Sequence, residues 1–275
     1  MLPTVRQLLL SPQRYSARQG AERWAGAVAQ NGGTVSDGRL TLVTTLIGRL
    51  MACGSWWLTD DLWMLVAENE AQALTSLKQR RLGATTATPT FTADAGYAFN
   101  GTTQYIDTGF IASSHAIALT RTSSRIGVYE RTNVAANTYA IGAINNSAVA
   151  WQLRPRNSGS TCLGNAGSQA ATFTLPAADS RGMLTVSRNG FAAADVKGFK
   201  NGALIARAAD PGAYGSTLTT RSLLIGCYSN NGTPAGFRAS TIGYACIGAA
   251  LTDTLQEEAD YAAVQAHMTP LGANV

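Results

Sequence analysis

The sequence has few of the residues that bind metals or act as nucleophiles. Among 275 residues it contains four cysteines and two histidines, and no two cysteines have the C-x-x-C spacing of a metal or redox site. Neither His115 nor His267 stands in a catalytic sequence context, which argues against Ser–His or Cys–His chemistry. We therefore expect no metal centre. The cysteines on predicted strands are interpreted as small apolar core residues: Cys162, Cys227 and Cys246.

Long apolar runs and clusters of like charge are also missing. No stretch approaches the ~18 apolar residues of a membrane-spanning helix, and the apolar run near the N-terminus is too short for a signal peptide. Only 13% of the residues are charged, the net charge is +5, and no basic run resembles a nucleic-acid-binding arm. No glycine-rich phosphate loop opens a helix. We therefore predict no cofactor, no nucleic-acid or membrane partner, and synthesis in a reducing bacterial cytoplasm.

The sequence does contain many apolar residues and glycines. It is 45% hydrophobic and has 28 glycines, which predicts an ordered protein with a sizeable core and many turns. Before about residue 82 the apolar spacing is that of helices, at about 21–28, 40–51, 62–66 and 71–77. The third of these helices would be capped by Thr59-Asp60-Asp61. The tryptophans of this part are interpreted as core or interface residues: Trp56, Trp57 and Trp63.

From Thr85 onward the sequence changes to short β runs separated by glycine, asparagine and proline. Asn201-Gly202 stands between two alternating runs, as in a type I′ hairpin turn. The predicted strands lie at 88–93, 104–108, 116–121, 125–131, 138–144, 148–154, 169–174, 181–188, 194–200, 203–208, 222–228 and 240–247. A terminal helix is predicted at about 253–268. Its inward face would carry Leu255, Ala259, Ala262 and Ala263.

This pattern predicts a mainly β protein, an antiparallel β-sandwich (jelly roll) preceded by a small α-helical module. We place the boundary in the Gly-, Ala- and Thr-rich stretch "RRLGATTATPT", where Pro89 disfavours a continuing helix. Residues 1–85 would form a helical leader for attachment or oligomerisation, and residues 86–275 the sandwich with its terminal helix.

Four ordered segments carry a resemblance to a known family: "PTFTADAGYAFNGTTQYIDTGF", "DSRGMLTVSRNG" with "KGFKNGALIARA", "RSLLIGCYSNNG", and "STIGYACIGAALTDTLQEEADYAAVQ". They resemble the concanavalin A-like lectin/glucanase (laminin-G-like) jelly rolls of tailed-bacteriophage and prophage structural proteins. The helical first 85 residues resemble the leader that often precedes such sandwiches. The resemblance implies a virion protein, such as a capsid decoration, spike or tail-fibre-associated protein. Its implied partners are other virion proteins, further copies of itself and a bacterial surface glycan.

The stretch "AFNGTTQYIDTGF", residues 98–110, is predicted to be a strand–turn–strand that starts the sandwich. Phe99, Ile106 and Phe110 would lie in or near the core. The alternative is a direct ligand role for its polar residues: Asn100, Tyr105 and Asp107.

Residues expected at the rim of the sandwich combine aromatic faces with hydrogen-bonding groups, which suits a sugar ring or a protein surface. These candidate glycan- or protein-binding residues are Tyr105, Asp107, Tyr129, Trp151, Arg154, Arg156, Tyr228, Asn230, Asn231 and Phe237. A weak calcium site near Asp107 is an alternative. We predict no metal there because the asparagine-rich loops contain no cluster of carboxylates.

A glycoside hydrolase of this fold needs two carboxylates that face one sugar-sized cleft. Enzymes of the family place them close together in a Glu-x-Asp-x-Glu type pattern, which this sequence lacks. Its sandwich carboxylates are scattered singly: Asp94, Asp107, Glu130, Asp179, Asp195 and Asp210. We therefore predict a non-enzymatic virion protein. The alternatives are a free carbohydrate-binding lectin and, less favoured, a glycoside hydrolase.

Overall fold

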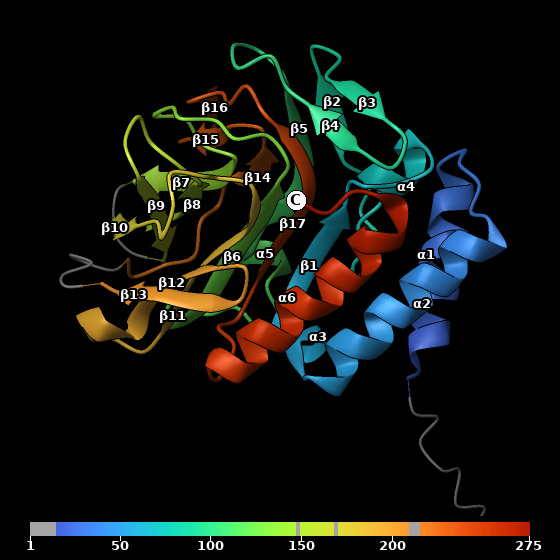
Figure 1. Ribbon diagram of the computed structural model, residues 1–275, viewed down its shortest axis with the longest axis horizontal. Helices are drawn as coiled ribbons and strands as arrows, with labels where there is room; N and C mark the ends of the chain where they lie inside the picture. Colours follow the sequence, from blue (N-terminus) through green and yellow to red (C-terminus); the bar gives the residue numbers. More distant parts are fainter. Residues whose placement is uncertain (1–14, 147–148, 168–169, 209–214) are drawn as a thin grey trace, which may run out of the picture.

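The computed structural model describes residues 15–146, 149–167, 170–208 and 215–275, and Figure 1 shows their arrangement. Asp210, the first residue of the predicted strand 148–154 and the first residue of the predicted strand 169–174 lie outside this part. No helix within these ranges is long and apolar enough to cross a membrane.

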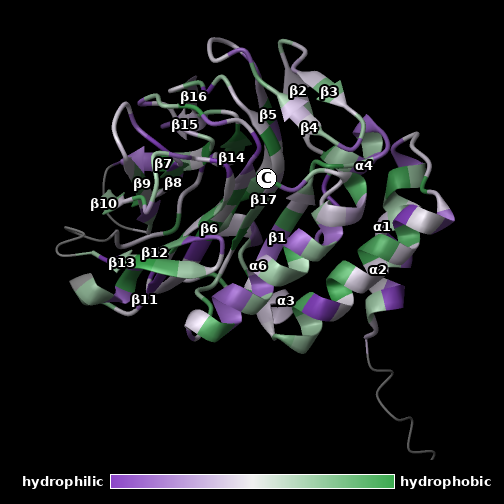
Figure 2. Ribbon diagram, in the orientation of Figure 1, coloured by the Kyte–Doolittle hydropathy of each residue, from purple (hydrophilic) through white to green (hydrophobic). Residues whose placement is uncertain are grey.

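Two of the predicted leader helices are confirmed as α1 (Ala17–Gln30) and α2 (Asp37–Ala52). A capping box begins α1, because the Ser16 hydroxyl accepts the Gln19 N–H and the Gln19 side chain accepts the Ser16 N–H. The Ser36 side chain caps α2 by accepting the Arg39 N–H at 3.1 Å. Figure 2 shows apolar and polar residues alternating around these helices, as expected for one buried face.

The predicted helix at 62–66 is wrong. After the short α3 (Ser55–Leu58), the chain forms strand β1 (Thr59–Met64), which pairs antiparallel with β17 (Thr241–Gly248). All six residues of β1 are buried, so its side chains are covered on both faces and a continuous run of buried residues replaces the usual alternation. The fourth predicted helix is the shorter α4 (Glu70–Leu74).

The described strands form two sheets that pack as a sandwich (Figure 1). The eight-stranded sheet has the order β13 (Ala203–Arg207), β12 (Val196–Lys200), β11 (Gly182–Asn189), β6 (Ser123–Glu130), β17, β4 (Gly96–Ala98) and β3 (Thr90–Thr92), with β1 also on β17. The nine-stranded sheet has the order β10 (Ala171–Thr174), β9 (Thr161–Ala166), β8 (Val149–Arg154), β7 (Ile141–Asn146), β14 (Ser222–Ile225), β5 (Tyr105–Ile111) and β2 (Ala84–Thr86). Its remaining strands are β15 (Tyr228–Asn230), which pairs with β7, and β16 (Thr233–Ala235). The predicted antiparallel sandwich is confirmed, with one parallel contact between β15 and β7.

Local turn chemistry explains where the strand predictions succeed and where they fail. The Asn201-Gly202 hairpin is confirmed, with φ of 50° and 78° at its two central residues. The predicted strand 116–121 is instead a loop after α5 (Ala112–His115). Its backbone N–H groups at 117, 118 and 119 donate to the buried Asp60 carboxylate and not to a neighbouring strand. Strand β9 was not predicted.

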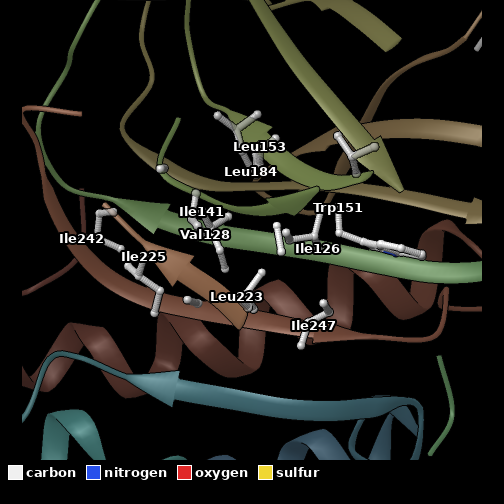
Figure 3. Packing of buried hydrophobic residues seen from close by; sticks show 14 of the residues in the cluster. Ile126, Val128, Ile141, Trp151, Leu153, Leu184, Leu223, Ile225, Ile242 and Ile247 are labelled. Carbon is white, nitrogen blue, oxygen red and sulfur yellow. The ribbon is translucent and has the colours of Figure 1, made fainter. Parts of the chain in front are cut away.

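The main core lies between the two sheets, as Figure 3 shows. It contains Phe99, Ile106 and Phe110, which confirms their predicted burial. The segment 98–110 is a strand–turn–strand whose two strands, β4 and β5, belong to different sheets. It is therefore a corner of the sandwich.

A second core lies between the helices and the outer face of the eight-stranded sheet. Trp56 belongs to it and Trp63 to the main core, but Trp57 is 54% exposed. The molecule thus has a helical layer, the eight-stranded sheet and the nine-stranded sheet. The division at residue 85 stays a prediction, although β1 already belongs to a sheet of the sandwich.

The terminal helix is α6 (Thr254–Met268), followed by a 3₁₀ turn at Thr269–Leu271; another 3₁₀ turn lies at Ala193–Asp195. The inward face predicted for α6 is only partly correct. Ala263 is buried, whereas Leu255 is 73% exposed and Ala262 is exposed. The buried face instead carries Glu257 and Asp260, which reach Arg125 on β6. The apolar pattern alone could not reveal a charged contact beneath the helix.

Candidate binding site on the nine-stranded sheet

The outer face of the nine-stranded sheet is the sheet face that the helical layer leaves open. Side chains along β5 alternate across it, with Ile106 and Thr108 buried and Tyr105 and Asp107 partly exposed. On the adjacent β14, Leu223 and Ile225 join the core between the sheets. Leu224, between them, points to the opposite face.

A hollow of about 270 Å³ lies on this face between β5, β14 and the β15–β16 hairpin. It is lined by Tyr105, Asp107, Thr220, Arg221, Ser222, Leu224, Ser229, Gly232 and Pro234. We call it the rim hollow. Its lining combines one aromatic ring, an aliphatic side chain and several hydrogen-bonding groups, and its volume is close to the lower end of small-ligand sites, at about 300 Å³.

Two opposite charges define the polar part of the rim hollow. The Asp107 carboxylate accepts the Ser222 hydroxyl and, at 2.9 Å, the Gly109 N–H. The Arg221 guanidinium donates to Asn231 Oδ1 at 2.7 Å, and its buried Nε has no hydrogen-bond partner among the described residues. A carboxylate acceptor and a guanidinium donor together match the hydroxyl groups of a sugar, which donate and accept.

Two aromatic pairs flank this polar centre. Tyr105 and Phe237 have ring centroids 6.2 Å apart, and Tyr139 and Tyr228 have centroids 4.7 Å apart. The Arg154 guanidinium lies 5.8 Å from the Tyr139 centroid, in a cation–π position. Burial raises the pKa of Tyr228, and the neighbouring Tyr139 adds to this, so its phenol stays neutral.

Glycine makes the second pair possible. A Cβ at Gly236 would lie 2.9 Å from the rings of both Tyr139 and Tyr228, and a Cβ at Gly142 would lie 2.9 Å from Tyr228 Cβ. Gly236 also has φ of 62°, a left-handed conformation that side chains disfavour. The Tyr139 and Tyr228 side chains therefore pack closely against the backbone at Gly236 and Gly142, where a larger residue would clash with them.

The structure brings together part of the predicted site. Tyr105 and Asp107 line the rim hollow, Asn231 holds Arg221, Asn230 ends β15, Phe237 pairs with Tyr105, and Tyr228 and Arg154 meet through Tyr139. Tyr129, Trp151 and Arg156 do not line the hollow.

Tyr129 and Trp151 do not reach this face. Trp151 is 1% exposed and lies in the core between the sheets (Figure 3). Tyr129 is buried under the helical layer, where its hydroxyl donates to Gln265 and accepts the Val275 N–H at 2.9 Å. Arg156 donates to Gly159 O and Asn133 Oδ1 and does not line the hollow.

Sequence reasoning missed Arg221, Ser222 and Tyr139. Along β14, Ser222 and Leu224 alternate with the core residues Leu223 and Ile225. Once the core-facing side of this strand is assigned, the alternation places Ser222 on the outer face. Arg221 and Tyr139 lie at strand ends, where alternation gives no signal.

The rim hollow contains a single carboxylate, Asp107, among its lining residues. Glu130 is fully buried and bound by Arg238, whose Nη2 lies 2.9 Å from Glu130 Oε2, so it faces no cleft. No group of three or more His, Cys, Asp or Glu side chains in the described ranges is placed to hold a metal. The lining residues offer hydrogen-bonding groups and one aromatic ring to a ligand.

No protein-family model matches this chain, and no curated protein matches it either. Its structure is similar to domain 4 of AbnA, a GH43 extracellular arabinanase from Geobacillus stearothermophilus in complex with arabinotriose, with a TM-score of 0.45 and 14% identity over 73% of this chain and 99% of that one. It is also similar to the botulinum neurotoxin serotype D binding domain, with a TM-score of 0.49 and 13% identity over 77% of this chain and 52% of that one. A Trypanosoma rangeli sialidase mutant displaying trans-sialidase activity gives a TM-score of 0.49 and 10% identity over 84% of this chain and 40% of that one. This chain thus spans about half of the toxin domain and two fifths of the sialidase. At such scores and identities these likenesses assign no function to it.

Proposed function

We propose that this chain is a non-enzymatic binding protein that takes a sugar residue of a bacterial surface glycan in the rim hollow. The observation that carries the proposal is the combination of the Tyr105 ring, the Asp107 carboxylate and the Arg221 guanidinium around one sugar-sized hollow. The ring offers a face to the C–H side of a sugar, and the two charged groups fix its hydroxyls.

The particle to which the protein belongs is a further part of the proposal. On the sequence resemblance, we infer a virion protein of a tailed phage or prophage-derived particle, made in the cytoplasm of the bacterial host. The leader attaches it to capsid or tail proteins, and the sandwich projects its nine-stranded sheet outward. A capsid decoration, a spike and a tail-fibre-associated protein all fit this description.

The glycan proposal is tested by screening the purified chain on an array of bacterial surface oligosaccharides, followed by calorimetry with the best binder. Tyr105→Ala should weaken binding at least about tenfold, a loss of ~1.4 kcal/mol. Asp107→Asn should also weaken it. Asp37→Asn makes the same chemical change at an exposed position on α2 and should leave affinity unchanged.

Three results would contradict the proposal. If the chain binds no oligosaccharide on the array, the proposal that it binds a glycan is refuted. If the Tyr105 and Asp107 variants bind as tightly as wild type, the glycan does not bind in the rim hollow. Release of reducing sugar that disappears in Asp107→Asn would make the protein a hydrolase. Mass spectrometry of purified particles tests the virion assignment separately, and absence of the chain from them would refute it.

A further inference from the structure

Exposed large apolar side chains gather at one end of the helical layer, away from the rim hollow. Seven large apolar residues of the described part are exposed, and three of them lie at this end: Trp57 (54%), Ile117 (81%) and Leu255 (73%). Trp57 and Ile117 line one hollow of about 440 Å³ together with Tyr15. Exposed apolar side chains gathered in this way mark an interaction surface.

Side-chain contacts connect these residues across three helices. The Tyr15 and Trp57 ring centroids are 6.2 Å apart, which joins the start of α1 to α3. Gln256, next to Leu255, donates from Nε2 to Cys53 O at 2.8 Å, which joins the start of α6 to the chain just before α3. Figure 1 shows the starts of α1 and α6 on either side of α3 along the lower edge of the molecule.

The two sides of this surface carry opposite charge. On the α1 side, the Arg23 guanidinium lies 5.4 Å from the Tyr15 ring centroid, and Arg80 lines the same hollow as Tyr15. Neither arginine forms an ion pair with a carboxylate within 4.0 Å among the described residues. The arginines that do are Arg18, Arg39, Arg125, Arg181 and Arg238.

On the α6 side, Asp253 and Glu258 are exposed. The last 25 residues contain four acidic residues and no Lys or Arg. Two of those acids, Glu257 and Asp260, are already bound to the buried Arg125. Asp253 and Glu258 therefore give the start of α6 a negative surface, next to the exposed Leu255.

We infer that this surface, the α1/α3/α6 patch, is where a second copy of the chain docks about a two-fold axis near Trp57. A two-fold axis places the same surface of both copies in contact. It brings the Arg23 and Arg80 side of each copy onto the Asp253 and Glu258 side of the other, twice. The apolar residues then form a desolvated centre and the charges a polar rim, with a tryptophan as the anchor. This inference is independent of the glycan proposal, since the patch and the rim hollow share no residue.

The patch suits a second copy better than an unrelated acidic or basic partner. A basic partner would be repelled by the α1 side, and an acidic partner by the α6 side. Only a surface that is itself positive at one end, apolar in the middle and negative at the other matches both, and this chain carries such a surface.

The experiment is sedimentation equilibrium of the full chain over a range of concentrations, with variants of each part of the patch. The wild-type chain should reach twice its mass of 28.7 kDa. Trp57→Ser should raise the dimer dissociation constant at least about 30-fold. Leu82→Ser is the matched control, because Leu82 is 52% exposed and lines a different hollow, which shares no residue with the hollow of Trp57, and it should leave the dimer unchanged. Circular dichroism confirms that the variants stay folded.

Charge reversal tests the predicted pairing directly. Arg80→Glu and Glu258→Arg should each weaken the dimer, and the double variant should regain affinity because each reversed charge meets its reversed partner. A wild-type chain that keeps the mass of one copy at every concentration overturns the inference. So does a Trp57→Ser dimer as tight as wild type, or a double variant weaker than both single variants.

Discussion

Replacing Glu257 by Gln is expected to change how the folding stability depends on pH. Glu257 and Asp260 both contact the guanidinium of Arg125, with Arg125 Nε 3.3 Å from Glu257 Oε2. All three side chains are buried beneath α6, so one positive charge faces two carboxylates in a site without solvent. Burial raises the pKa of Glu257 to about 7; Arg125 opposes this rise and Asp260 adds to it.

The sign follows from proton binding in the two states. The unfolded chain releases the Glu257 proton near pH 4.5, whereas the native chain holds it to about pH 7. Between these values the native state binds more protons, so the free energy of unfolding falls as the pH rises. At ~1.4 kcal/mol per pH unit, the wild-type chain loses about 3 kcal/mol over this window, relative to a chain with Gln at this position.

Urea unfolding of both proteins between pH ~4.5 and ~8 measures this difference. His267 contributes an opposite slope, because burial lowers its pKa to about 4 and stability from it rises with pH up to about 6.5. It is present in both proteins and cancels in the difference. Asp37→Asn, which removes a carboxylate at an exposed position on α2, is the control variant. A flat or rising difference for Glu257→Gln would refute the reasoning and show that Arg125 keeps Glu257 ionised at every pH tested.

Two further predictions concern the glycines of the site and the segment before β2. Gly236→Ala should cost about 2–3 kcal/mol of stability and abolish glycan binding, because its Cβ meets the Tyr139 and Tyr228 rings. Gly109→Ala is the control, because Gly109 has φ of 66° and open space around the Cβ position. In the same urea titration it should lower the free energy of unfolding by only about 1 kcal/mol, which is the effect of the backbone conformation alone. Brief trypsin treatment should cut first at Arg80 or Arg81, as seen on denaturing gels. On native gel filtration the two fragments should elute together, because β1 pairs with β17. First cuts within residues 86–275 would contradict the proposed boundary, and separating fragments would contradict the anchoring role of β1.

Alternating and turn-rich segments made most of the sandwich predictable. The Asn201-Gly202 hairpin follows from its turn residues, and β5 follows from its alternation of buried and less buried residues. Strands β6, β11 and β17 are buried on both faces and do not alternate; they were found as short apolar runs in a part of the sequence rich in turn residues. Strand β1 is also buried on both faces, but it follows helical spacing and begins with Thr59-Asp60-Asp61, which has the pattern of a helix N-cap, so it was taken for a helix. The buried Glu257 and Asp260 were missed for a related reason, because sequence spacing does not show that Arg125, far away in the chain, lies beneath α6.

The binding face was predictable only where strand alternation assigned a direction. Tyr105 and Asp107 alternate with buried Ile106 and Thr108, and both proved to line the rim hollow. Tyr129 and Trp151 lie on strands buried on both faces, where an aromatic residue has no sequence mark that separates core from rim. Arg221 depends on the β15–β16 hairpin folding back to place Asn231 beside it.

The order of the layers connects the two proposals. The helices cover the eight-stranded sheet, so the helical end of the molecule and the open face of the nine-stranded sheet point in different directions (Figure 1). A dimer through the α1/α3/α6 patch therefore leaves both rim hollows free. A hollow of about 270 Å³ has room for one sugar residue, and a site of this size supports only weak binding by itself. Two such sites held in one assembly turn the second contact into an intramolecular one, and overall affinity rises by ~10²–10⁴ when the linkage can span the repeats of the glycan.

Trp57→Ser should therefore lower the avidity for an immobilised polysaccharide and leave the affinity for its free monosaccharide unchanged. Surface plasmon resonance measures both quantities. A loss of monosaccharide affinity in the same variant would show that the two surfaces are not independent.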